Sequence, residues 1–186
     1  ISGEFPILSA PHKIIAPPPI PTYKVKVSPG QVDARNNQPY KTTGTKDYIF
    51  SSIKISTDKE VFLNSIKWNM SGSGGFGSFE NLKTYINDVP YDVVSSLDGK
   101  YFTSNFNRVI VNRNETKEIY IKGDIVDSQH TLNLDIFKDI DLNIADENGN
   151  IIIPKAEQLW DYDNSGGFRR GNPWYDGYKV EIKNDL

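Results

Sequence analysis

Several short stretches of the chain alternate apolar and polar residues at every second position. Residues 61–70 do so with Asn64 as the exception, setting Phe62, Ile66, Trp68 and Met70 against Ser65, Lys67 and Asn69. Residues 132–144 repeat the pattern, setting Leu132, Leu134, Ile136, Ile140, Leu142 and Ile144 against Asn133, Asp135, Asp141 and Asn143. Successive side chains of a strand point to opposite faces, so this period predicts strands with one face toward a core. No stretch has a convincing helical period, and the pattern favours an antiparallel all-β domain.

The same patterns place a series of short strands along the chain. The segments between them carry turn residues such as Asp98-Gly99 and Asn148-Gly149, which suit tight hairpins because both residues tolerate positive φ. Because the strand lengths and connections vary, we expect a two-sheet β-sandwich, immunoglobulin-like or jelly-roll-like, with long loops. The expected strands lie near residues 23–28, 47–57, 61–70, 81–87, 91–95, 106–112, 116–125, 131–137, 140–145, 150–153 and 177–183.

The N-terminal residues differ from the rest of the chain. Residues 1–5 read like a remnant of cloning, and residues 6–22 contain six prolines. Proline fixes φ and removes the amide donor, so we expect an extended linker that holds a module away from another domain or a cell envelope. The single β-sandwich domain is expected over residues 23–186, with an aromatic-rich loop at 154–178.

Composition narrows the function classes. The 186 residues suffice for one domain with a sizeable core, and no apolar run reaches the length of a membrane span. The net charge is −3 and the basic residues are scattered, which argues against a nucleic-acid partner. The chain has no cysteine, which excludes disulfides, thiolate zinc sites and a cysteine nucleophile without excluding secretion.

Two segments resemble a known kind of module. Residues 61–68 (VFLNSIKW) lead through a glycine-rich loop to residues 80–86 (ENLKTYI), and residues 114–125 (NETKEIYIKGDI) follow later. This order resembles the immunoglobulin-like β-sandwich modules of large bacterial cell-surface and S-layer-type proteins, over about residues 46–145. The resemblance implies an extracellular, non-enzymatic role in structural spacing or adhesion, with a surface-protein partner. A phage or viral receptor-binding domain is an alternative of much the same composition.

The resemblance also raises an intramolecular isopeptide bond, which such surface modules sometimes use in place of disulfides. It needs a buried lysine, an asparagine or aspartate, and a neighbouring acid. Lys67 and Asp135 lie on expected strands, but the alternation places both side chains outward.

Aromatic and charged residues concentrate near the C-terminus. Flat rings beside carboxylates and guanidinium groups are what a sugar surface or a protein contact requires, so a carbohydrate-binding module with a glycan partner is a further alternative. The other interpretation is that this loop folds over an open end of the sandwich and its rings finish the core. The candidate ligand-binding residues are Trp160, Tyr162, Phe168, Arg169, Arg170, Trp174 and Tyr175.

The same region contains a possible Ca²⁺ loop. Asp161, Asp163 and Ser165 stand at alternate positions and are followed by glycine, which is the arrangement a hard cation needs. The downstream bidentate glutamate of an EF-hand is missing, because Asn172 stands in its place. An Asx-rich turn explains the same residues.

Catalytic motifs find little support. The glycine-rich loop at 72–77 lacks the Lys-Ser/Thr pair and the following helix of a phosphate-binding loop. The only histidines are His12, in the linker, and His130, so a Ser-His-Asp arrangement would have to rest on His130. Among the 24 acidic residues, no pair stands out for glycoside hydrolysis. We therefore expect no enzymatic activity and no required cofactor.

Overall fold

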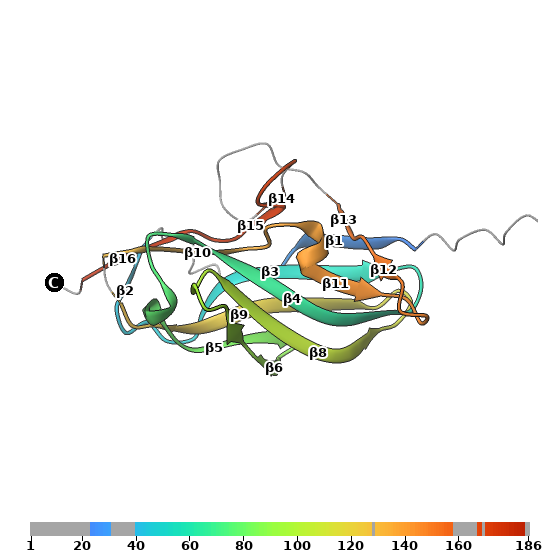
Figure 1. Ribbon diagram of the computed structural model, residues 1–186, viewed down its shortest axis with the longest axis horizontal. Helices are drawn as coiled ribbons and strands as arrows, with labels where there is room; N and C mark the ends of the chain where they lie inside the picture. The colour runs from blue at the N-terminus through green and yellow to red at the C-terminus, as the bar shows by residue number, and fades with distance from the viewer. Residues whose placement is uncertain (1–22, 31–39, 128, 158–166, 169, 185–186) are drawn as a thin grey trace, which may run out of the picture.

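Two large β-sheets pack face to face around one hydrophobic core (Figure 1). The structure is a computed structural model, and it describes residues 23–30, 40–127, 129–157, 167–168 and 170–184. The predicted all-β sandwich is confirmed, and all strand pairs are antiparallel except β1 with β13 and β16 with β2. Among the described residues, no helix is long and apolar enough to span a membrane.

The first sheet has six strands, and β3 and β9 form its centre. Eight residue pairs join these two strands, with one irregularity between Ile49 and Ser51. In order across the sheet, the strands are β13 (Lys155–Ala156), β1 (Val25–Pro29), β3 (Tyr48–Thr57), β9 (Thr116–Ile125), β5 (Phe79–Ile86) and β6 (Val89–Asp92).

The second sheet has eight strands and is organised around β4, the longest strand of the described chain. One edge of β4 pairs with β8, and the other edge pairs with β11 and then with β10. The strands are β12 (Ile151–Ile152), β11 (Leu142–Ala145), β4 (Val61–Gly72), β10 (Thr131–Asp135), β16 (Val180–Lys183), β2 (Tyr40–Thr42), β8 (Tyr101–Val111) and β7 (Val94–Ser95).

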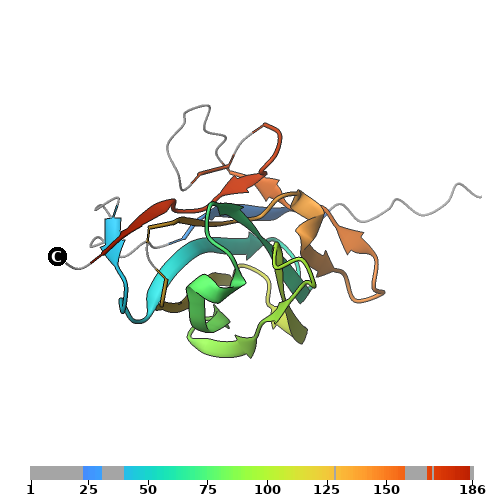
Figure 2. The same ribbon diagram turned by 60° about the vertical axis from the view of Figure 1, so that its left-hand side comes forward.

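Three shorter features complete the described chain. The 3₁₀ turn η2 (Phe76–Ser78) precedes β5, and η3 (Asp139–Asp141) precedes β11. The two-residue strands β14 (Gly167–Phe168) and β15 (Tyr175–Asp176) pair with each other and project above the sandwich in both views (Figures 1 and 2).

The core confirms most of the predicted alternation and corrects it in β4. Ile66 and Trp68 are fully buried as expected, but Phe62 is only half-buried, and its neighbour Leu63 is fully buried instead. The reason is a β-bulge, because the pairing of β4 with β11 shifts by one residue around Asn64. The extra residue shifts the alternation of core-facing and solvent-facing positions by one residue. This shift explains why Asn64 broke the expected pattern.

A second correction concerns residues 140 and 141. Ile140 was expected to face the core, but it is 54% exposed, whereas Asp141 is buried. The chain forms η3 here rather than a strand, so the alternation of period two does not apply. Asp141 accepts the backbone N–H of Lys138 and forms an ion pair of 2.7 Å with Lys67.

Candidate functional site

The C-terminal aromatic residues divide into buried and surface groups. Phe168 and Tyr175 are fully buried, and their ring centroids lie 4.8 Å apart. Trp174 is half-buried and packs edge-on against Phe168, while Arg170 is exposed. Phe168 and Tyr175 therefore finish the core, and only Trp174 and Arg170 offer a surface to a ligand within this described group.

The remaining predicted residues of this region lie outside the described residues. Among the candidate ligand-binding residues they are Trp160, Tyr162 and Arg169, and among the candidate Ca²⁺ ligands they are Asp161, Asp163 and Ser165. Ca²⁺ binding by this loop stays a prediction.

The segment around Tyr175 ties the two sheets together. Tyr175 exchanges backbone hydrogen bonds of 3.0 and 2.9 Å with Ile136, just after β10 of the second sheet. Its hydroxyl donates to the carbonyl oxygen of Ser52 in β3 of the first sheet, at 2.7 Å. The backbone N–H of Tyr178 donates to the carbonyl of Phe50 in the same strand. The segment thus closes one edge of the sandwich.

A polar cluster lies where this segment covers β10. Asp135 accepts a 2.6 Å hydrogen bond from the Ser71 hydroxyl and a 3.1 Å bond from the backbone N–H of Gly177. The amide nitrogen of Asn133 donates to Asp176 at 2.9 Å. We call Ser71, Asn133, Asp135 and Asp176 the β10 polar cluster.

Burial raises the pKa of Asp135 to about 6, and the neighbouring carboxyl of Asp176 contributes to the rise. The hydrogen bonds from Ser71 and Gly177 act in the opposite direction. Asp135 does point away from the core, as the alternation predicts, but the covering segment leaves it only 2% exposed.

The residues considered for an isopeptide bond have other partners. The Lys67 ammonium pairs with Asp141 and lies 5.0 Å from the ring centroid of Tyr101. Asp135 is held by Ser71 and Gly177. The contacts of Lys67 and of Asp135 are therefore made with other residues, and none of them links the two side chains to each other.

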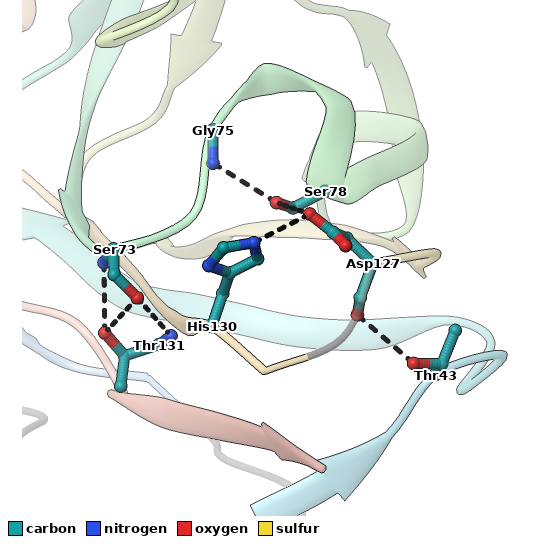
Figure 3. A network of polar contacts seen from close by, with 7 residues as sticks. All are labelled: Thr43, Ser73, Gly75, Ser78, Asp127, His130 and Thr131. Carbon is teal, nitrogen blue, oxygen red and sulfur yellow. Dashed lines mark hydrogen bonds and ion pairs between the residues drawn. The ribbon is translucent and has the colours of Figure 1, made fainter. Parts of the chain in front are cut away.

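His130 belongs to a second polar network, at the glycine-rich loop (Figure 3). Its Nε2 lies 3.1 Å from Oδ2 of Asp127, and the same oxygen accepts a 3.4 Å hydrogen bond from the Ser78 hydroxyl. In a Ser-His-Asp triad the serine bonds to the histidine, whereas here the carboxylate stands between the two. This order suits the fastening of loops better than the activation of a serine.

The same network fixes the glycine-rich loop. The backbone N–H of Gly75 donates to the Ser78 hydroxyl, and Ser73 and Thr131 exchange backbone-to-hydroxyl hydrogen bonds of 3.1 and 3.0 Å (Figure 3). These bonds are made within the protein, so the Ser73 and Gly75 amides serve the loop itself.

Sequence reasoning did not identify the β10 polar cluster as a site. The alternation assigned Asn133 and Asp135 to the solvent-facing side of a strand, and Asp176 was not among the candidate residues of the C-terminal stretch. The signal that could have found them is the pair of polar residues at i and i+2, combined with a later strand able to cover them. Among the described residues, no group of three His, Cys, Asp or Glu side chains could hold a metal.

Two comparisons, with protein-family models and with curated proteins, found no relative. No protein-family model matches the chain, and a search of curated proteins found no match. The likeness to bacterial surface modules therefore rests on the sequence pattern alone.

Proposed function

We propose that this chain is a non-enzymatic, extracellular module of a bacterial surface protein that acts in structural spacing or adhesion. The observation that supports this proposal best is the path of the chain along the sandwich. The start of β1 and the end of β16 lie toward opposite ends of the longest axis (Figures 1 and 2). In a chain of domains, a module with this path would add nearly the full length of the module to the chain.

The strand pairing suits mechanical load along that axis. β1 pairs along its whole length with β3, from Val25 with Thr57 to Pro29 with Ile53, and it pairs with β13 on its other side. Antiparallel hydrogen bonds run perpendicular to the strands, so a pull along β1 loads them together in shear. Bonds that must break together resist force better than bonds that open one by one.

Single-molecule force spectroscopy tests this role. The module is pulled once through its two ends and once through its N-terminal end and Asn148→Cys, a unique thiol in this cysteine-free chain. Asn148 is exposed in the turn between β11 and β12. The β11–β12 turn lies toward the end where β1 starts (Figure 1). End-to-end pulling should require a clearly higher unfolding force. Equal forces in the two geometries would count against a spacing role.

Carbohydrate binding is the second candidate function, and Trp174 supports it. Its ring is half-buried, held edge-on by Phe168 and close in sequence to the exposed Arg170. A glycan array compares the wild type, Trp174→Ala and the control Phe76→Ala, which removes the aromatic ring of a residue that is 57% exposed in η2. Binding that is lost only with Trp174→Ala would favour this function, and an absence of binding by the wild type would reject it.

A further inference from the structure

The outer face of the second sheet is apolar at the end where β4 begins. Directly paired residues of neighbouring strands have their side chains on the same face, so the register defines rows across a sheet. One such row crosses β12, β11, β4 and β8, and its members are Ile151, Ala145, Phe62 and Ile110. The core lies on the other face, where Ile152, Leu63 and Val111 are buried. Ile151 is 55% and Ile110 is 45% exposed, and we call the four members of the row the outer apolar row.

The sequence of these strands is typical of strands that are covered on both faces. Residues 61–63 (VFL), 109–111 (VIV) and 151–153 (III) are continuous apolar runs. A strand with one face in water alternates, whereas a strand buried on both faces has a continuous apolar run. Farther along β4 the outer face is polar, with Lys67 and Asn69 on it. The runs therefore indicate that another surface covers the outer apolar row, because the described part of the chain leaves both ends of the row exposed.

The two sides of the row carry opposite charges. On the β8 side, the guanidinium carbon of Arg108 lies 4.3 Å from the ring centroid of Phe62, and Arg113 is exposed in the turn after β8. On the β12 side, Glu147 is exposed in the turn between β11 and β12. A face with one basic and one acidic side is complementary to a second copy of itself after a rotation of 180° about an axis along the strands.

We propose that the outer apolar row packs against the same row of a second copy of this chain. A two-fold axis parallel to the strands would place Ile151 of each copy over Ile110 of the other. The same rotation would bring Glu147 of each copy toward Arg113 of the other. Both copies would then point in the same direction along their long axes, so the contact joins modules that stand side by side.

The size of the row predicts a weak dimer. Four strands at a spacing of about 4.8 Å place the two ends of the row about 14 Å apart. A standard interface buries about 800 Å² on each partner, and a contact centred on one row is smaller than this. We therefore expect a Kd on the order of 10–100 μM.

Sedimentation equilibrium of the 186-residue chain, from about 1 μM to about 1 mM, tests the proposal. The average mass of the wild type should rise from one chain toward two. Ile110→Asp and Ile151→Asp should each remain monomeric, because each places a charge in the row, and two variants guard against a fault in the folding of one. The control Leu97→Asp adds the same charge at a fully exposed residue beyond the opposite end of β8 and should dimerise like the wild type. A wild type that stays monomeric over this range, or row variants that dimerise as it does, would overturn the proposal.

An exchange of charges tests the orientation of the two copies. Arg113→Glu and Glu147→Arg should each raise the Kd roughly tenfold at low ionic strength, because each sets like charges opposite one another. The double variant Arg113→Glu/Glu147→Arg should recover the wild-type Kd, because each copy then offers the reversed pair. Single exchanges without effect, or a double variant without recovery, would show that the copies do not pack in the proposed orientation.

Discussion

The hydroxyl of Tyr175 donates a 2.7 Å hydrogen bond to the backbone carbonyl oxygen of Ser52, and both residues are fully buried. The bond joins the C-terminal segment to β3 of the first sheet, while the backbone of Tyr175 pairs with Ile136 beside the second sheet. Burial raises the pKa of the Tyr175 hydroxyl well above its ordinary value, so it remains a neutral donor. One side chain thus links the segment to both layers.

Tyr175→Phe should lower the free energy of unfolding by about 0.5–1.5 kcal/mol, the usual value of one hydrogen bond. The loss stays moderate because the Ser52 carbonyl also accepts the backbone N–H of Gly30 at 2.8 Å. Urea unfolding measures the change. Tyr40→Phe is the matched control, since Tyr40 is 45% exposed and its substitution should have little effect. An equal loss in both variants would contradict the assigned role of the buried bond.

Thr84→Val tests a polar chain inside the core. The Thr84 hydroxyl accepts hydrogen bonds from the Trp68 indole N–H at 3.0 Å and from the Ser104 hydroxyl at 2.9 Å, and all three residues are fully buried. Because valine leaves both donors unpaired, we expect a loss of about 2–4 kcal/mol in the free energy of unfolding. Thermal and urea unfolding measure it.

A double-mutant cycle with Ser104→Ala distinguishes lost hydrogen bonds from altered packing. The alanine removes one of the two donors that valine leaves unpaired. Thr84→Val/Ser104→Ala should therefore be more stable than the sum of the single losses predicts. Strict additivity would show that the Ser104 bond contributes nothing.

The sequence pattern predicted the bounds of several longer strands closely. β9 has the predicted bounds, and β3 and β10 lie within one or two residues of theirs. The inversion of Phe62 and Leu63 was not predictable, because the bulge at Asn64 appears in the pairing with β8 and with β11, about 40 to 80 residues later. Four other short strands were missed for a simpler reason, since β2, β13, β14 and β15 have two or three residues and show no period.

The candidate site was only partly predictable. The residue types near the C-terminus were consistent with both a binding surface and a completed core, and side-chain burial decides this for Phe168 and Tyr175. The burial of Asn133 and Asp135 depends on a strand that returns more than 40 residues later, so the local alternation predicted exposure. Alternation identifies the face of a strand, but it does not indicate whether another segment covers that face.

Asp124→Asn should destabilise the protein at neutral pH. The carboxylate accepts the backbone N–H of Asp47, the Asn81 amide and the Lys46 ammonium at 3.0, 2.7 and 3.0 Å. These bonds, with that from Asp47 first, lower the pKa of Asp124 to about 2. We expect the variant to lose about 1–3 kcal/mol in the free energy of unfolding at pH 7.

The pH dependence of this loss follows from the lowered pKa. The unfolded chain binds the proton at a higher pH, near 3.9, than the folded protein does. The contribution of Asp124 is therefore complete above about pH 4 and is lost as the pH falls toward 2. Urea unfolding of wild type and variant between pH 7 and 2 should show the difference closing over that range. A difference that is the same at pH 2.5 and pH 7 would contradict the assignment.

Gly177→Ala should detach the C-terminal segment from β10. An added Cβ would collide with the backbone carbonyl oxygen of Leu134 and come within 2.7 Å of Oδ1 of Asn133. Because a strand carbonyl cannot move aside as a side-chain tip can, we expect a loss of about 2 kcal/mol or more and earlier proteolytic cleavage near the C-terminus. Gly77→Ala is the matched control, since an added Cβ there meets nothing within 4 Å. If Gly177→Ala proved as stable and as protease-resistant as Gly77→Ala, the close contact between this segment and β10 would be wrong.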